Sequence, residues 1–186
     1  MIFAVRFDQN QIDRANFALA NVQNGAPRAL ANAINRAVNG IRTDIVAAVV
    51  AEYAIKPSDV RKTIRVRGAS PANLTGAAIS TGGTIPLIKF NVNPKKPKRV
   101  PVLRAGVRMG NQEAIPQAFT ATMRGHTGVF MRKGKNRFPL RELYAPSIPQ
   151  LIGNERVIKV VQDNAGDRLS KNLDHEIDRL LRGFGA

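Results

Sequence analysis

The stretch that decides the fold runs from residue 112 to residue 151 and reads QEAIPQAFTATMRGHTGVFMRKGKNRFPLRELYAPSIPQL. At its centre, apolar and polar side chains alternate with a period of two, in the order Phe119, Thr120, Ala121, Thr122, Met123, Arg124. Such alternation is typical of a strand with one buried and one solvated face. We therefore expect a strand here, with Phe119, Ala121 and Met123 on its buried side.

Two glycine-containing segments follow this strand. The tetrad Gly125-His126-Thr127-Gly128 is expected to form a turn, and Val129 to Met131 a returning strand. Gly134-Lys135-Asn136 interrupts the pattern again before a third strand begins at Arg137. The stretch therefore predicts an antiparallel meander, which needs a helical cover because a small sheet with one apolar face is not stable alone in water.

Two long helices are predicted to provide that cover. Between Arg28 and Tyr53, apolar residues recur with the spacing of an amphipathic helix, about 40 Å long at 1.5 Å per residue. A second helix is expected from about residue 155 to 182, with an apolar stripe made of Val157, Val160, Val161, Leu169, Leu173, Ile177, Leu180 and Leu181. The fold class is thus α+β: a small antiparallel sheet or meander covered by a long N-terminal amphipathic helix and a C-terminal helix, with extended basic loops.

The remaining elements are short, and a chain of 186 residues is the size of one domain, taken here as residues 1–186. A cap at Asp8-Gln9-Asn10 is expected before a helix, and Pro57 is expected to end the long helix region. The short elements are a strand at residues 2–7, a helix at 12–22, a strand at 63–67, and paired strands at 74–80 and 84–90 around Thr81-Gly82-Gly83.

Positive charge is concentrated in one part of the chain. The 29 Lys and Arg against 13 Asp and Glu give a formal charge of +16. Residues 95–141 hold 12 of these bases and a single acid, Glu113. The segment from about residue 91 to 101 has two prolines and a run of cations, which predicts an exposed basic Lys/Pro loop.

A chain this basic is attracted to polyanions: DNA, RNA, an acidic protein or an anionic surface. The candidate nucleic-acid-binding residues are Lys95, Lys96, Lys98, Arg99, Arg132, Lys133, Lys135 and Arg137. Ammonium and guanidinium groups bind phosphates without base-specific geometry, and aromatic residues for base stacking are scarce. Duplex backbone is therefore the expected nucleic-acid target, and the competing interpretation is that these charges only keep the chain soluble.

Catalysis, metals and membranes are not expected. The chain has no cysteine, which excludes disulfides, thiolate zinc sites and cysteine nucleophiles. His126 is interpreted as a turn residue and His175 as a helix-surface residue, and Asp174, Glu176 and Asp178 as a solvated helix face. No catalytic residue, metal ligand or cofactor is assigned. The opening MIFAVRFD lacks the basic n-region of a signal peptide, and the apolar run from Ile45 to Ala51 is too short to cross a bilayer. A soluble, intracellularly made chain is therefore expected.

One apparent phosphate-loop motif fails. The spacing from Gly128 to Gly134-Lys135 is one residue too long for that loop. Asn136 also stands where a Ser or Thr is needed to meet magnesium. A turn in the meander explains these glycines better, so an enzyme is not expected.

Several segments taken in order resemble the prophage minor tail protein Z family, the tail-completion proteins of long-tailed phages. The strongest is Ile115-Pro116-Gln117-Ala118-Phe119. The others are Ala33-Ile34-Asn35-Arg36, Val60-Arg61-Lys62, Ile85-Pro86-Leu87-Ile88-Lys89, Gly134-Lys135-Asn136-Arg137-Phe138-Pro139 and Ser147-Ile148-Pro149. They are colinear over about residues 25–185, and their order and spacing carry the resemblance.

The resemblance implies a non-enzymatic virion protein at the head-proximal end of the tail. Its implied partners are tail tube, tail terminator or head-connector proteins, with the end of the tape-measure protein and duplex DNA as further candidates in the lumen. It also implies a homo-oligomeric ring, with a hexamer favoured because it matches the symmetry of a tail tube. The alternative from another class is a free protein that binds duplex DNA or takes part in DNA packaging.

Overall fold

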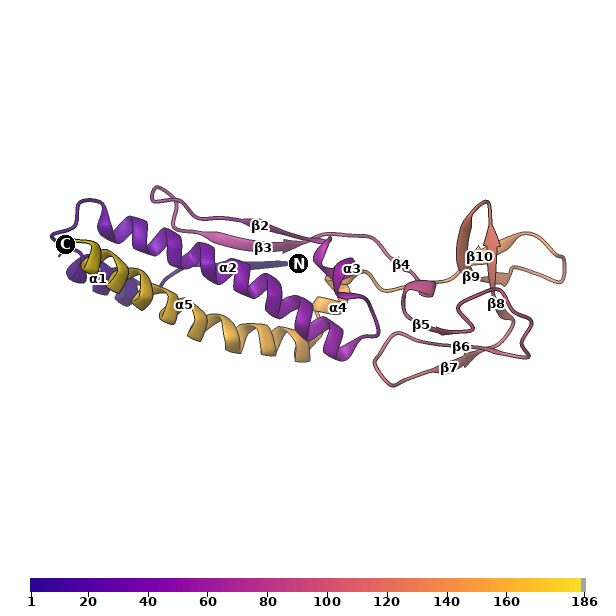
Figure 1. Ribbon diagram of the computed structural model, residues 1–186. Helices are drawn as coiled ribbons and strands as arrows, with labels where there is room; N and C mark the ends of the chain where they lie inside the picture. Colours follow the sequence, from indigo (N-terminus) through magenta and orange to yellow (C-terminus); the bar gives the residue numbers. More distant parts are fainter. Residues whose placement is uncertain (185–186) are drawn as a thin grey trace. The chain divides into compact units, whose positions relative to one another are not determined.

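The computed structural model of the protein describes residues 1–184, which divide into two compact units. Unit 1 comprises residues 1–45, residues 64–80 and the chain from Glu155 onward. Unit 2 comprises residues 46–63 and 81–154. Long helices at both ends of the chain and several small antiparallel sheets between them confirm the α+β class (Figure 1). The expectation that residues 1–186 act as one domain stays a prediction.

Unit 1 contains a three-stranded antiparallel sheet in the order β1-β3-β2. Its strands are β1 (Ile2–Val5), β2 (Ile64–Arg67) and β3 (Gly76–Ser80). The ammonium group of Met1 donates to the Ser80 carbonyl oxygen at 3.1 Å, and the Ser80 amide donates to the Met1 carbonyl oxygen at 2.9 Å. These bonds fix the end of β1 to the central strand, so the beginning of the chain is part of the sheet.

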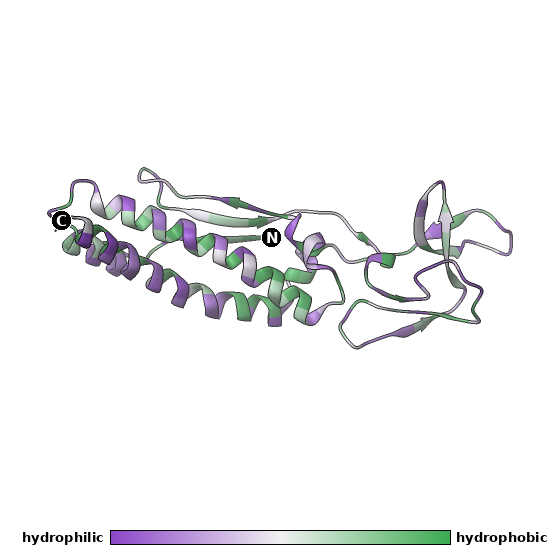
Figure 2. Cartoon of the chain, in the orientation of Figure 1, coloured by the Kyte–Doolittle hydropathy of each residue, from purple (hydrophilic) through white to green (hydrophobic). Residues whose placement is uncertain are grey.

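Three helices belong to this unit: α1 (Gln9–Ala18), most of α2 (Gly25–Glu52) and α5 (Glu155–Phe184). Figure 2 shows hydrophobic and hydrophilic residues alternating along α2 and α5, as an amphipathic pattern requires. A Cβ atom at position 76 of β3 would lie 2.6 Å from Ile34 Cγ2 and 2.7 Å from Val38 Cγ2. Gly76 therefore lets α2 pack directly on the sheet.

The helix α1 begins three residues earlier than its sequence pattern predicts. Asp8 accepts a hydrogen bond from the Gln11 amide at 2.8 Å, and the Gln11 side chain accepts one from the Asp8 amide at 3.3 Å. This reciprocal capping box satisfies two amides that the first turn of a helix leaves unpaired. It fixes the start of α1 directly after the cap, at Gln9.

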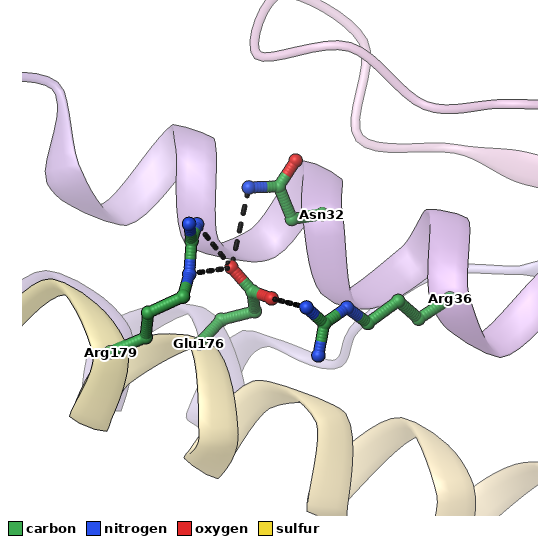
Figure 3. A network of polar contacts seen from close by, with 4 residues as sticks. All are labelled: Asn32, Arg36, Glu176 and Arg179. Atoms are coloured by element: carbon green, nitrogen blue, oxygen red, sulfur yellow. Dashed lines mark hydrogen bonds and ion pairs between the residues drawn. The ribbon is translucent and has the colours of Figure 1, made fainter.

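The carboxylate of Glu176 corrects the expected solvated face of α5. Its side chain is only 1% exposed, and its oxygens accept from Arg179 at 2.6 Å, from Asn32 at 3.3 Å and from Arg36 at 3.1 Å (Figure 3). Asn32 and Arg36 come from α2. Asp44 of α2 likewise binds Arg168 of α5 with both carboxylate oxygens, at 2.9 and 3.0 Å. The buried carboxylate of Glu176 and the partly exposed Asp44–Arg168 pair thus join the two long helices, which lie side by side (Figure 1).

Unit 2 consists of short elements. Its sheets have the orders β10-β9-β8, β5-β6-β7 and β11-β4. The strands are β4 (Ile85–Pro86), β5 (Asn91–Asn93), β6 (Leu103–Gly106), β7 (Glu113–Ile115), β8 (Ala118–Met123), β9 (His126–Arg132), β10 (Leu140–Glu142) and β11 (Tyr144–Ala145). Its short helices are α3 (Pro57–Arg61), α4 (Ile148–Ile152) and a 3-10 turn at Leu87–Lys89. The predicted meander is therefore present as β8-β9-β10, but its third strand begins at Leu140 and not at Arg137. The meander belongs to unit 2, whereas β1-β3-β2, the sheet on which α2 packs, belongs to unit 1.

The predicted hairpin between residues 74–80 and 84–90 is wrong. Both edges of β3 are already used, because it pairs with β1 on one side and with β2 on the other. Ile85 and Pro86 pair instead with Ala145 and Tyr144 of β11. The chain then enters the 3-10 turn at Leu87–Lys89, so the second strand of the expected hairpin does not continue.

The turn of the meander also lies earlier than predicted. Met123 pairs with His126, which leaves Arg124 and Gly125 as a two-residue turn with φ of 49° and 79°. Positive φ at both central residues matches the twist of the strands that such a turn connects. His126 and Thr127 are therefore the first residues of β9 and not part of the turn.

Among the helices within residues 1–184, none combines the length and the apolar character that a bilayer-crossing segment requires.

Candidate functional site

All eight candidate basic residues lie in unit 2, on two loops. Lys95, Lys96, Lys98 and Arg99 belong to the Lys/Pro loop, which joins β5 to β6 as residues 94–102. It begins three residues later than predicted, because residues 91–93 form β5. Arg132 is the last residue of β9, and the other three lie in the loop that joins β9 to β10, here called the β9–β10 loop (residues 133–139). All eight side chains are exposed. Their role as a binding site stays a prediction.

The two loops begin close to one hairpin. Thr120 in the middle of β8 donates from its hydroxyl to the carbonyl oxygen of Pro94 at 2.7 Å, where the Lys/Pro loop starts. β8 pairs along its length with β9, and Ala118 lies opposite Met131, next to Arg132. The predicted faces of this strand are wrong: Thr120, expected to be solvated, is only 5% exposed, whereas Phe119, Ala121 and Met123, expected to be buried, are half-buried. The structure thus attaches both basic loops to the same pair of strands.

Two cations of the β9–β10 region are positioned by aromatic rings. The Arg132 guanidinium lies over the Phe119 ring, 5.3 Å from its centroid, and that of Arg137 lies 5.7 Å from the centroid of Phe138. A ring face attracts a cation without neutralising it. Both guanidinium groups therefore keep their full charge and their N–H donors for other partners.

The surroundings contain almost no compensating charge. Unit 2 holds 16 Lys and Arg against four Asp and Glu, whereas unit 1 holds 13 against nine. The acids of unit 2 bond elsewhere; Asp59, for example, pairs with Lys89 at 3.4 Å. Within residues 1–184, none of the ion pairs involves any of the eight candidate cations. This part of unit 2 therefore presents a strongly positive potential to its surroundings.

Glu142 of β10 takes part in a small polar cluster next to these loops. Its Oε1 lies 2.7 Å from His126 Nε2, and its Oε2 accepts from the Tyr144 hydroxyl at 2.8 Å. Partial burial acts to raise the pKa of Glu142, but the hydrogen bonds from His126 and Tyr144 outweigh it and the pKa is lowered. The hydrogen bond from the Tyr144 hydroxyl to Glu142 also raises the pKa of Tyr144. A Cβ atom at position 128 would lie 2.6 Å from Glu142 Oε1, so Gly128 makes room for the carboxylate and is not a turn residue.

The histidines and acids do not assemble into a metal site within the described part of the chain. No group of three or more His, Cys, Asp or Glu among residues 1–184 could hold a metal ion. His175 is exposed on α5, as expected, whereas His126 lies in β9 beside Glu142.

Sequence reasoning missed the residues that support the basic loops. Thr120 and Phe119 were assigned to a strand and given no role at the loops, and Gly128 was assigned to a turn. The Pro116-Gln117 pair was a usable signal for the start of β8, because it forms the tight turn between β7 and β8. Here Gln117 has a φ of 61°, as the third residue of such a turn requires.

Comparisons with known proteins point to one family. The family described as prophage minor tail protein Z (GPZ) matches residues 11–185, which is nearly the whole chain. No curated protein and no solved structure matches the chain. The family implies a structural, non-enzymatic role in a phage tail and an association with other tail or virion components. With the resemblance of the colinear segments confirmed, the chain belongs to the prophage minor tail protein Z family.

Proposed function

We propose that the protein completes the head-proximal end of a phage tail and joins the tail tube to the head connector, with no bond made or broken. Its partners on this proposal are tail tube, tail terminator and head-connector proteins, together with the end of the tape-measure protein. Both units act as one tail-completion domain within the virion. Membership of a minor tail protein family supports this function.

The proposal rests on one observation: in the part of the chain that the structure describes, charged side chains are paired within unit 1, whereas eight cations of unit 2 are not. An adaptor in a DNA conduit needs one part that keeps its shape and another that faces a polyanion. Unit 1 places its buried carboxylate between cations of its own helices, whereas eight exposed cations of unit 2 have no acidic partner among residues 1–184. Unit 2 therefore supplies the surface that faces the lumen.

A closed ring fits this arrangement. In a ring of identical subunits each contact is repeated around one axis, so the basic loops of every copy form a positive collar. A hexamer is the favoured state because it matches the symmetry of a tail tube. Duplex DNA passing through the collar is held through its phosphates, with no sequence preference.

Electron cryomicroscopy of assembled particles tests this proposal. We expect ring density for the protein between the tail tube and the head connector, with the Lys/Pro loop and the β9–β10 loop toward the axis. Particles assembled with all eight cations changed to Gln should seat their DNA abnormally. Absence of the protein from mature particles would contradict the proposal, and so would normal DNA seating with the changed protein.

The second candidate function is a free protein that binds duplex DNA or assists packaging, and the same exposed cations favour it. The two functions differ in the state of the active protein. A monomer that binds duplex with strongly salt-dependent affinity supports the free form. A closed oligomer that joins tail tubes supports the tail-completion role, and sedimentation of the purified protein with and without tail tubes separates them.

A further inference from the structure

The β9–β10 loop borders a surface hollow that distinguishes it from the Lys/Pro loop. The hollow has a volume of about 460 Å³ and is lined by Gln117, Arg132, Lys133, Gly134 and Lys135. Three of the five lining residues are cations, and no acid lines it. We propose that this hollow binds one phosphodiester group of a duplex nucleic acid and is the fixed contact of the basic surface, while the Lys/Pro loop adds only diffuse attraction. This inference rests on the proposed function, because it names where that function holds the polyanion.

The framework of the hollow fixes the Arg132 guanidinium and the base of the β9–β10 loop. Arg132 pairs with Leu140 at the end of the β9–β10 ladder, and the Lys133 amide donates to the Pro139 carbonyl oxygen at 3.1 Å, which closes the loop at its base. The ring of Phe119 lies against the Arg132 guanidinium. A donor that is already oriented loses less freedom when it binds, and its hydrogen bonds to a phosphate are charge-assisted.

Gln117 adds a further donor from the neighbouring strand, β8, at the same end of the hairpin as Arg132. It comes directly before β8, whose first residue, Ala118, pairs with Met131 of β9. The left-handed backbone at Gln117 turns the chain at the rim of the hollow. Its amide adds a neutral N–H donor, which suits a phosphodiester because each such group carries a single negative charge on two oxygens.

The chemistry of the lining favours a phosphate backbone over an acidic protein. Protein interfaces carry apolar and aromatic residues at their centre, and none lines this hollow. Arginine and lysine beside an amide are instead the usual donors to nucleic-acid phosphates. The Lys/Pro loop carries the same number of candidate cations, four, but its lysines do not line this hollow.

A pair of matched variants tests the inference. K133Q/K135Q removes two charges from the hollow, and K96Q/K98Q removes two charges with the same spacing from the Lys/Pro loop. Binding of a fluorescent duplex of mixed sequence to the full-length protein is measured by anisotropy at low salt. We expect K133Q/K135Q to weaken binding about 30-fold, since charge-assisted hydrogen bonds are lost. We expect K96Q/K98Q to weaken it about threefold, because exposed charges at a distance are screened.

A charge-neutral variant provides a second readout. F119L removes the ring under Arg132 without changing net charge, and we expect it to weaken binding about fivefold. Thermal unfolding of each variant shows whether the fold is retained, and K133Q/K135Q, which changes only exposed side chains, keeps the test valid if F119L unfolds.

The outcomes separate this inference from the proposed function. Equal losses for K133Q/K135Q and K96Q/K98Q would overturn the hollow but leave polyanion binding by unit 2 intact. No loss with either variant would overturn both the hollow and the contact with DNA. Polyglutamate of the same total charge that competes as well as unlabelled duplex would overturn the assignment to a phosphodiester and support an acidic protein partner.

Discussion

The two units of this protein use charged residues in opposite ways. In unit 1 charges of both signs are paired, between helices in Arg14 with Asp174, Arg36 with Glu176 and Arg168 with Asp44, and within α5 in Arg179 with Glu176. In unit 2 the bases outnumber the acids 16 to four, and the eight candidate cations lack an acidic partner among the described residues. Charge in unit 1 therefore contributes to the fold, and most charge in unit 2 is available to other molecules.

The difference follows from where the charges lie. A carboxylate that is buried between helices must be paired, because an unpaired buried charge costs several kcal/mol. A cation on an exposed loop remains hydrated and needs no partner within the chain. The contrast can be tested by substitution: changes to charged groups should affect stability in unit 1 and binding to other molecules in unit 2.

The largest effect on stability is expected from Gly106 in unit 2, where packing and not charge decides. A Cβ atom at this position of β6 would lie 1.5 Å from the Asn111 carbonyl oxygen, which belongs to the backbone and cannot rotate away. Gly106→Ala should lower the free energy of unfolding by about 4 kcal/mol, as measured by urea denaturation. Gly134→Ala, at a position where no atom lies within 4 Å of a new Cβ, is the control and should have little effect. Equal effects of the two changes would contradict this account of the β6–β7 hairpin.

The next largest effect is expected from Glu176 in unit 1. Glu176→Ala removes three polar partners and leaves a gap between α2 and α5, so the free energy of unfolding should fall by about 3 kcal/mol. Glu176→Gln keeps the size of the side chain and should cost less. Asp178→Ala on the exposed side of α5 is a matched control. If Glu176→Ala were as harmless as Asp178→Ala in chemical denaturation, charge would not hold unit 1 together.

A smaller, pH-dependent effect is expected from Glu142. Its pKa is lowered in the folded state, so its contribution to stability is complete above the unfolded value of about 4.3 and is lost as the pH falls through the folded value. Glu142→Gln should therefore be less stable than the natural protein by about 1 kcal/mol at pH 6, with the difference shrinking toward pH 3. Denaturation curves across this range measure it, and a difference that is independent of pH would show that the carboxylate charge is not involved.

The smallest effect on stability is expected from the eight cations themselves. Changing all of them to Gln should alter the free energy of unfolding by about 0.5 kcal/mol or less, toward greater stability, because repulsion within unit 2 is reduced. The same protein should lose most of its affinity for duplex. A marked destabilisation of this variant would mean that the basic loops are part of the fold, and the contrast between the two units would fail.

Much of the fold could be predicted from local patterns. The long helices were expected at residues 28–53 and 155–182 and occur as α2 and α5, because their apolar spacing is repeated over many turns. Strand pairings were harder to predict from the sequence. The partners of β3 come from residues 2–5 and 64–67, and the second of these is close in sequence while the first is not. Alternation of apolar and polar residues identifies a strand, but it does not show which strand far away in the sequence pairs with it.

The residues of the candidate site could be predicted from the sequence, but their arrangement in space could not. The eight cations stand out in the sequence as a local excess, but Glu176 was assigned to the solvent because charged residues on helices are usually exposed. Its position three residues after Leu173 and four before Leu180, on the apolar stripe, was the available signal. Phe119 and Thr120 gained their roles only through contacts with distant residues.

The sequence by itself determined the class of the protein: two amphipathic helices, short alternating strands, and an excess of positive charge within residues 95–141. These are local properties, since helix periodicity, turn chemistry and net charge depend on neighbouring residues. Only the tertiary structure decided which cations are neutralised and which remain free. That outcome depends on which side chains of distant segments meet, as Glu176 meets Arg36 and Thr120 meets Pro94, and such meetings are fixed by packing and not by sequence spacing.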